Sequence, residues 1–353
     1  MKLSFYIMIC LILISPRVIA QDEIDPYTIQ DSIFLLSNIF EHDQPAELTL
    51  KFNIKGYQRN KYKDHYMPAE LIYFFGDSLM ERHHSVRIKA RGTARKEVCS
   101  FPPIRLNIKK SGIQDDLFPE VKKIKIVTHC RGSQQNLNYL MKEFLTYKIY
   151  SIISPYSFRV RLLKIKYIDT GRKDKVTDTW AFMIEPEEML AERLDMLPLK
   201  LDHLGFVHTD TLWTDYMVMF QYMIGNADYS IPGRHNIKLL VPKDPIKINP
   251  VPVPYDFDYS GIVNSDYAIP REEIGLSKIT ERYFLGPCRS FEEFREIIEI
   301  FQSKKQEIYD LINNFEYLSL RERAKLIKYL DEFYNGSSHS HYIKNNILST
   351  CRD

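Results

Sequence analysis

Four side chains that end in oxygen atoms lie in one stretch of the sequence, at Asp228, Asn236, Asp256 and Asp258. Asp228 and Asn236 follow an apolar segment, and the two later aspartates flank Phe257 where a hydrophobic segment ends. Carboxylate and amide oxygens are ligands of divalent metals such as Mg²⁺, and a carboxylate can also accept the proton of an attacking hydroxyl group. The group therefore predicts metal and phosphate chemistry.

The order of these residues is more informative than any one of them. Taken singly, each is also typical of a turn, because Asp and Asn side chains hydrogen-bond to nearby backbone. A loop Asp, then an Asn, then two strands and an Asp-Phe-Asp turn is the order found in kinases. By analogy with that order, Asp228 would be the catalytic carboxylate, and Asn236, Asp256 and the nearby Asp258 would bind metal.

The elements that position these residues follow from hydrophobic periodicity. An apolar helix is predicted from Thr211 to Ile224 and ends at Gly225. Period-two alternation before it predicts several strands, among them 46–54, 85–91, 104–110, 121–127, 157–168 and 179–184. Capping boxes after it begin helices at Ser290 and Ser319. Strands followed by helices predict an α+β chain with two lobes that share a cleft.

The predicted division of the chain has four parts. Residues 1–20 have the layout of a secretory signal peptide, with Lys2 before an apolar run and Ala20 at its end. Residues 21–195 form a β-rich N-terminal lobe, and residues 196–335 form a helical C-terminal lobe with the catalytic and metal-binding loops. Residues 336–353 form a polar tail that is expected to fray. No later segment is long and apolar enough to span a membrane, so the mature protein is expected to be periplasmic, secreted or on the cell surface.

Export changes the interpretation of the cysteines. Cys99, Cys130, Cys288 and Cys351 remain after signal removal, in a compartment where disulfides persist. We favour a pair between Cys99 and Cys130, since each lies at the end of a strand-like run in the same half of the chain. Free buried cysteines are the alternative. With 48 basic and 46 acidic residues, the balanced charge gives no indication of nucleic-acid binding.

The cations that phosphates require are predicted on the strand 104–110. Arg105 and Lys109 share its polar face, while Ile104, Leu106 and Ile108 point to the core. A solvated edge strand is the alternative interpretation of that face. A helix predicted over 134–151 carries Glu143 among apolar residues.

Five ordered motifs between residues 85 and 261 together resemble the spore-coat protein H (CotH) family of atypical kinases. They are Arg91-Gly92, Phe101-Pro102 with the strand after it, the helix with Glu143, Asn226-Ala227-Asp228 through His235-Asn236, and Pro254 through Tyr259. The resemblance implies a two-lobed protein-kinase-like fold, ATP with Mg²⁺ or Mn²⁺, and phosphoryl transfer to Ser or Thr of an extracytoplasmic protein. It also implies that Gly92, Arg105 or Lys109, and Glu143 contact or support the cofactor, with Glu143 paired to the cation.

The alternative is a catalytically inert kinase-like module that acts as an envelope or surface binding protein. Two features favour it. The chain has no glycine-rich phosphate loop, and Tyr229-Ser230 stand where the family commonly has Arg-His after the catalytic Asp.

Overall fold

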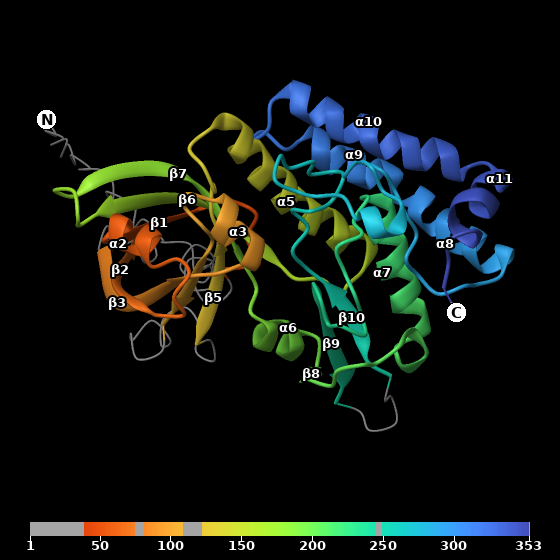
Figure 1. Ribbon diagram of the computed structural model, residues 1–353, viewed down its shortest axis with the longest axis horizontal. Coiled ribbons are helices and arrows are strands. Elements are labelled where there is room, and N and C mark those ends of the chain that lie inside the picture. Colours follow the sequence, from red (N-terminus) through yellow and green to blue (C-terminus); the bar gives the residue numbers. More distant parts are fainter. Residues whose placement is uncertain (1–38, 75–80, 109–121, 244–248, 353) are drawn as a thin grey trace, which may run out of the picture.

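The computed structural model describes residues 39–74, 81–108, 122–243 and 249–352 of the protein (Figure 1). A sheet-rich part is followed by a helical C-terminal part, which agrees in outline with the predicted α+β organisation. The predicted signal peptide 1–20 and Lys109 lie outside the described residues. None of the helices formed by the described residues is both long and apolar enough to cross a bilayer.

Strands β1 to β7 close into a barrel in the order β1-β2-β3-β4-β5-β7-β6. Their pairs are antiparallel, except that β1 runs parallel to β6 and so closes the barrel. Alternation in the sequence points one face inward, where Leu50, Ile88, Ile104, Ile126 and Leu163 are fully buried. The strands are Ala46–Phe52, Met67–Phe74, Glu81–Ala90, Ile104–Asn107, Lys123–Val127, Val160–Asp169 and Lys175–Ile184.

Short helices lie between strands of the barrel and at its exit (Figure 1). Helix α3 (Thr93–Val98) follows β3, and α6 (Glu187–Arg193) follows β7, while α2 (Ile54–Arg59) lies after β1. A separate antiparallel sheet has the order β10-β9-β8. Its strands are Met196–Leu199 (β8), Ile237–Pro242 (β9) and Val251–Pro254 (β10).

The larger hydrophobic core lies in the helical part and includes helix α5 (Gln134–Ile153). This differs from the predicted lobe boundary, because α5 comes before the last barrel strands yet packs against α7 (Thr211–Met223) and α9 (Lys305–Asn313). Lys142 of α5 also forms a buried ion pair, 2.8 Å long, with Glu322 of α10 (Leu320–Ser337). Helix α5 therefore belongs to the helical core although it is flanked by barrel strands.

The predicted fraying of the tail after residue 335 is wrong. Helix α10 continues to Ser337 and is followed by α11 (Ser340–Tyr342) and a π-helix (Ile343–Leu348). Ile343 and Ile347 are buried in the larger core, where α8 (Phe291–Ser303) contacts the π-helix. Apolar side chains at these positions bury surface that a polar tail would leave in water.

Two disulfides join segments that are distant in the sequence. Cys99 bonds to Cys130, which confirms the predicted pair, and Cys288 bonds to Cys351. Beside the second disulfide, the backbone N–H of Arg352 donates to the carbonyl of Gly286 at 2.9 Å. The C-terminal segment is thereby held against the chain just before α8.

The second disulfide yields a stability prediction. Replacing both cysteines, Cys288→Ser with Cys351→Ser, should lower the free energy of unfolding by about 2–4 kcal/mol, because the unfolded chain regains the freedom of a long closed loop. Urea unfolding measures the loss, and hydrogen exchange should show faster exchange in residues 343–352. An unchanged midpoint with unchanged exchange would show that the segment is held without the bond.

Candidate functional site

A cavity of about 760 Å³, here called the central cavity, lies where the outer face of the barrel meets the turns of the helical part. Its size is typical of small-molecule sites. The predicted residues Gly92, Arg105, Asp228, Asn236, Asp256 and Asp258 all line it. The fold therefore brings together side chains from β4, from the turn after α7 and from the turn after β10.

One wall of the central cavity carries cations. Arg105 of β4 and Lys125 of β5 are cross-strand partners, so their side chains project from the same face of the sheet. The Lys125 ammonium lies 4.3 Å from the centre of the Tyr255 ring. Burial, with Arg91 and Lys238 nearby, lowers the pKa of Lys125 to about 7. This wall therefore carries two neighbouring cations, and burial weakens the charge of one of them near neutral pH.

The opposite wall begins with the turn that ends α7. Gly225 adopts φ +64, and a side chain there would collide with the Tyr329 hydroxyl, so the turn requires glycine. The buried Asn226 amide donates to Gln221 Oε1 at 3.0 Å, and its own oxygen accepts the backbone N–H of Asp228 at 2.9 Å. This network fixes the backbone that presents Asp228.

The Asp228 carboxylate is held at both oxygens. Asn236 Nδ2 donates to Oδ2 at 3.0 Å and to the Asp228 carbonyl at 2.8 Å. His235 Nε2 lies 2.8 Å from Oδ1, and this hydrogen bond raises the pKa of His235. Asp228 remains partly exposed to the cavity. It is an oriented carboxylate that lines the central cavity.

The buried side chain of Phe257 holds the backbone at Asp256 in place. Phe257 is fully buried, with its ring 4.7 Å from that of Tyr147 and 5.8 Å from that of Phe220. Asp256 has φ +66, and its backbone N–H donates to the Tyr147 hydroxyl at 2.8 Å. The left-handed conformation at a non-glycine residue costs about 1–3 kcal/mol. The surrounding packing maintains it and turns the carboxylate into the cavity.

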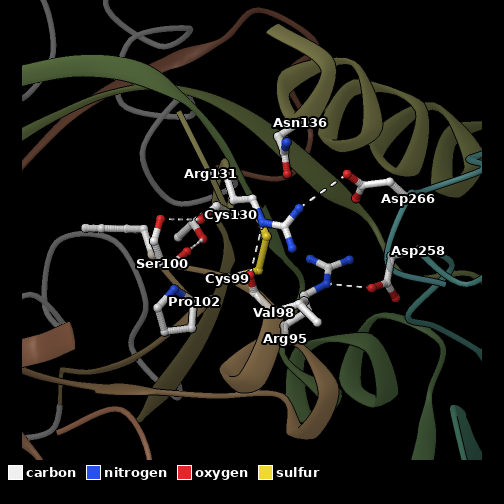
Figure 2. The surroundings of a disulfide bond; sticks show 12 residues. Arg95, Val98, Cys99, Ser100, Pro102, Cys130, Arg131, Asn136, Asp258 and Asp266 are labelled. Carbon is white, nitrogen blue, oxygen red and sulfur yellow. Dashed lines mark hydrogen bonds and ion pairs between the residues drawn. A yellow bond between two sulfur atoms is a disulfide. The ribbon is translucent and has the colours of Figure 1, made fainter. Parts of the chain in front are cut away.

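A buried guanidinium binds the third carboxylate of this wall. Arg95 Nε donates to Asp258 Oδ2 at 2.6 Å, and Arg95 Nη2 pairs with Glu143 Oε2. Figure 2 shows the Arg95–Asp258 pair beside the Cys99–Cys130 disulfide. Helix α3 carries Arg95 and ends at Cys99, whose backbone N–H donates to the Arg95 carbonyl. The disulfide therefore fixes the end of the helix that presents the guanidinium.

The acidic charge around Arg95 exceeds the basic charge. Carboxylate oxygens of Glu143, Asp256 and Asp258 lie within 4.8 Å of one another. Burial and the two aspartates raise the pKa of Glu143 to about 8, although Arg95 opposes the shift. Glu143 Oε1 is buried and has no hydrogen-bond partner among the described residues. Three carboxylates with one guanidinium and an orphaned oxygen are suited to a hard divalent cation.

The structure differs from the predictions in the partner of Glu143 and in the contacts of the Asn236 side chain. Glu143 pairs with Arg95 and not with Arg105, because α5 directs Glu143 towards α3 at the edge of the barrel. Asn236 contributes its amide hydrogens to Asp228, while the oxygen cluster consists of Glu143 and the two later aspartates.

The sequence interpretation missed Arg95 and Lys125. The alternation in the strand of Lys125 could have placed this lysine on the polar face, as it did for Arg105. The strand register was needed to show that the two residues are neighbours.

No protein-family model matches the chain, and no curated protein matches it. Among solved structures, the chain is similar to the crystal structure of a proinflammatory kinase of Helicobacter pylori, CtkA. The TM-score is 0.39 at 11% sequence identity, and the match covers 63% of this chain and 91% of that chain. A likeness of this degree assigns neither family nor activity.

The Arg95 cluster yields a prediction with a matched control. Arg95→Met should lower the free energy of unfolding by about 3–5 kcal/mol at pH 8, because two buried carboxylates lose their partner. The folded variant then holds carboxyl groups with raised pKa values and binds more protons than the unfolded chain, so its stability should recover as the pH falls towards about 5.

Urea unfolding in EDTA measures both effects. Arg295→Met is the control, since the Arg295–Glu299 pair of α8 is exposed and is expected to contribute about 1 kcal/mol or less. Equal losses in the two variants, or no pH recovery, would contradict the role of Arg95.

Proposed function

We propose that this protein is an exported, ATP-dependent protein kinase with a two-lobed protein-kinase-like fold. The observation that carries the proposal is the central cavity, with cations of the barrel on one wall and an oriented carboxylate and a carboxylate cluster on the other. Phosphoryl transfer depends on such an arrangement, because catalysis consists mainly of positioning and charge stabilisation. Arg105 and Lys125 would contact the phosphates, and Gly92 would line the nucleotide site.

The residues present fit a divalent metal, Mg²⁺ or Mn²⁺. Asp256 and Asp258 would hold it, with Glu143 as a further ligand through its unpartnered oxygen. Asn236 would contribute its amide oxygen if its side chain turned from Asp228. Bound there, the metal would neutralise the phosphates of ATP and the excess negative charge of the cluster.

Asp228 would act on the acceptor hydroxyl. The oxygen of a Ser or Thr forms a bond to the γ-phosphorus, the bond from that phosphorus to the bridging β–γ oxygen breaks, and ADP leaves. The hydroxyl proton passes to the Asp228 carboxylate. His235 would hold this carboxylate in place, together with Asn236 as long as its amide stays on Asp228.

The extracytoplasmic location is part of the same proposal. Two disulfides are typical of exported proteins, because cytosolic thiols are kept reduced. The predicted signal peptide at residues 1–20 and the resemblance to the CotH family support the same location. Acceptor residues would then belong to another exported protein.

The activity is tested by incubating the protein with ATP, Mg²⁺ or Mn²⁺ and an exported protein fraction. Label at the γ-phosphate should be transferred, whereas label at the α-phosphate should not. Asp228→Asn should reduce transfer by about a hundredfold or more, and Asp256→Ala should abolish metal-dependent transfer.

Asp266→Asn is the matched control, because Asp266 is exposed and does not line the central cavity. Transfer that survives in Asp228→Asn and Asp256→Ala would refute the assignments. Transfer of the α-label would indicate nucleotidyl transfer. Binding of ATP without transfer by any route would favour the inert binding module.

Lys125 yields a pH prediction. Phosphates bind the protonated ammonium, whose pKa in the free protein is about 7. The advantage of the wild type over Lys125→Met in ATP affinity should therefore be full below pH 7 and should shrink as the pH rises above it.

Calorimetric titration of both proteins at several pH values measures this difference. Lys166→Met, which removes an exposed lysine of β6, should behave as the wild type does. A difference that does not change with pH would show that Lys125 stays charged throughout.

A further inference from the structure

A second cavity, of about 600 Å³, adjoins the loop that carries Asp228. We call it the arginine cavity, because Arg271, Arg289 and Arg352 line it. Apolar side chains, among them Phe206 and Leu285, form the rest of its wall, and no carboxylate residue lines it in the described part of the chain. The lining of the cavity is therefore basic and favours an anionic group.

Two of the three arginines already form ion pairs with carboxylates. Arg289 Nε donates to Asp215 Oδ2 at 2.9 Å, and Arg271 Nε donates to Glu273 Oε1 at 2.7 Å. Arg352 is exposed, and within the described residues its guanidinium has no recorded hydrogen bond or ion pair. One cation at the rim of the cavity is therefore available for a ligand.

The disulfide Cys288–Cys351 places Arg352 on this wall. The backbone N–H of Cys288 donates to the Arg352 carbonyl at 3.1 Å, and the Arg352 N–H donates to the Gly286 carbonyl at 2.9 Å. Two arginines that follow cysteines of one disulfide are thus fixed beside the same cavity. Because the backbone that carries them is already held in place, binding orders only their side chains.

Tyr229 provides an independent indication of a ligand. It lines the arginine cavity and is only 6% exposed, yet its hydroxyl has no hydrogen-bond partner in the described structure. Burial raises the pKa of Tyr229, while the nearby Arg352 and Arg271 oppose the rise. A buried hydroxyl without a partner destabilises the folded state. A ligand oxygen would satisfy it between the guanidiniums.

The arginine cavity lies close to the proposed site of phosphoryl transfer. Tyr229 and Ser230, which line it, directly follow Asp228 in the chain. Arg271 Nη1 donates to the carbonyl of Ala227 at 2.9 Å, so the same arginine contacts the loop on the other side of Asp228. An extended peptide advances about 3.5 Å per residue, so its side chains in this cavity would lie a few residues from the acceptor.

We propose that the arginine cavity binds an acidic segment of the acceptor protein. Glutamate or aspartate side chains would pair with Arg352 and its neighbours and accept from Tyr229, while an apolar side chain packs against Phe206 and Leu285. This inference rests on the proposed function, because it assigns the class of protein that presents its hydroxyl to Asp228.

Direct binding tests the inference without depending on catalysis. A fluorescent peptide with one serine, one leucine and a run of glutamates is titrated with the full protein, and a peptide with glutamine at each glutamate is the comparison. The wild type should bind the glutamate peptide at least about tenfold more tightly, and Arg352→Glu should remove that preference. Arg352→Gln removes the charge with less disturbance and should reduce it.

Arg295→Glu is the matched control, since it reverses an exposed arginine of α8 outside this cavity. Equal binding of both peptides, an unchanged preference in both Arg352 variants, or tighter binding of a phosphoserine peptide than of the glutamate peptide would overturn the inference. Absence of phosphoryl transfer in the wild type, with the peptide preference intact, would instead refute the proposed function.

Discussion

A guanidinium buried between two carboxylates joins the parts of this molecule on which its site depends. Arg95 comes from a short helix at the edge of the barrel, Glu143 from the long helix of the larger core, and Asp258 from the turn after β10. Removing such charges from water is costly, and only close pairing offsets the cost. Because the three segments are distant in the sequence, their pairing constrains where the barrel lies relative to the helical part.

The same constraint separates opposite charges across the central cavity. The barrel presents Arg105 and Lys125 through the register of β4 with β5, and the helical part presents Asp228 and Asp256 on turns that buried residues anchor. Tyr147 supports the acidic wall, since its ring packs against Phe257 and its hydroxyl accepts from the backbone N–H of Asp256. A site built in this way depends on packing far from its polar atoms.

The turn after α7 contacts two cavities with different character. Asp228 and Asn236 line the central cavity, whereas Tyr229 and Ser230 line the arginine cavity. Neighbouring residues of one short segment therefore line two different cavities. The C-terminal disulfide matters for the second cavity, because it brings a residue from the end of the chain to a wall formed by the middle of it.

The sequence by itself determined the local structure and part of the site. Alternation identified the barrel strands, the capping serines Ser290 and Ser319 began their helices, and the Cys99–Cys130 pair followed from the strand ends. These features depend on neighbours along the chain, so periodicity and capping chemistry suffice to find them. The clustering of Asp228, Asn236, Asp256 and Asp258 around one cavity also agrees with their expected order.

Only the tertiary structure decided which distant groups meet. Closure of the barrel by β1 and β6, the ion pair of Glu143 with Arg95 and the burial of the C-terminal segment all join residues far apart in the chain. Such contacts depend on strand register and on the packing of whole elements, and local sequence patterns do not determine these. The sequence therefore identified side chains that could form a site, whereas the fold determined which residues they contact.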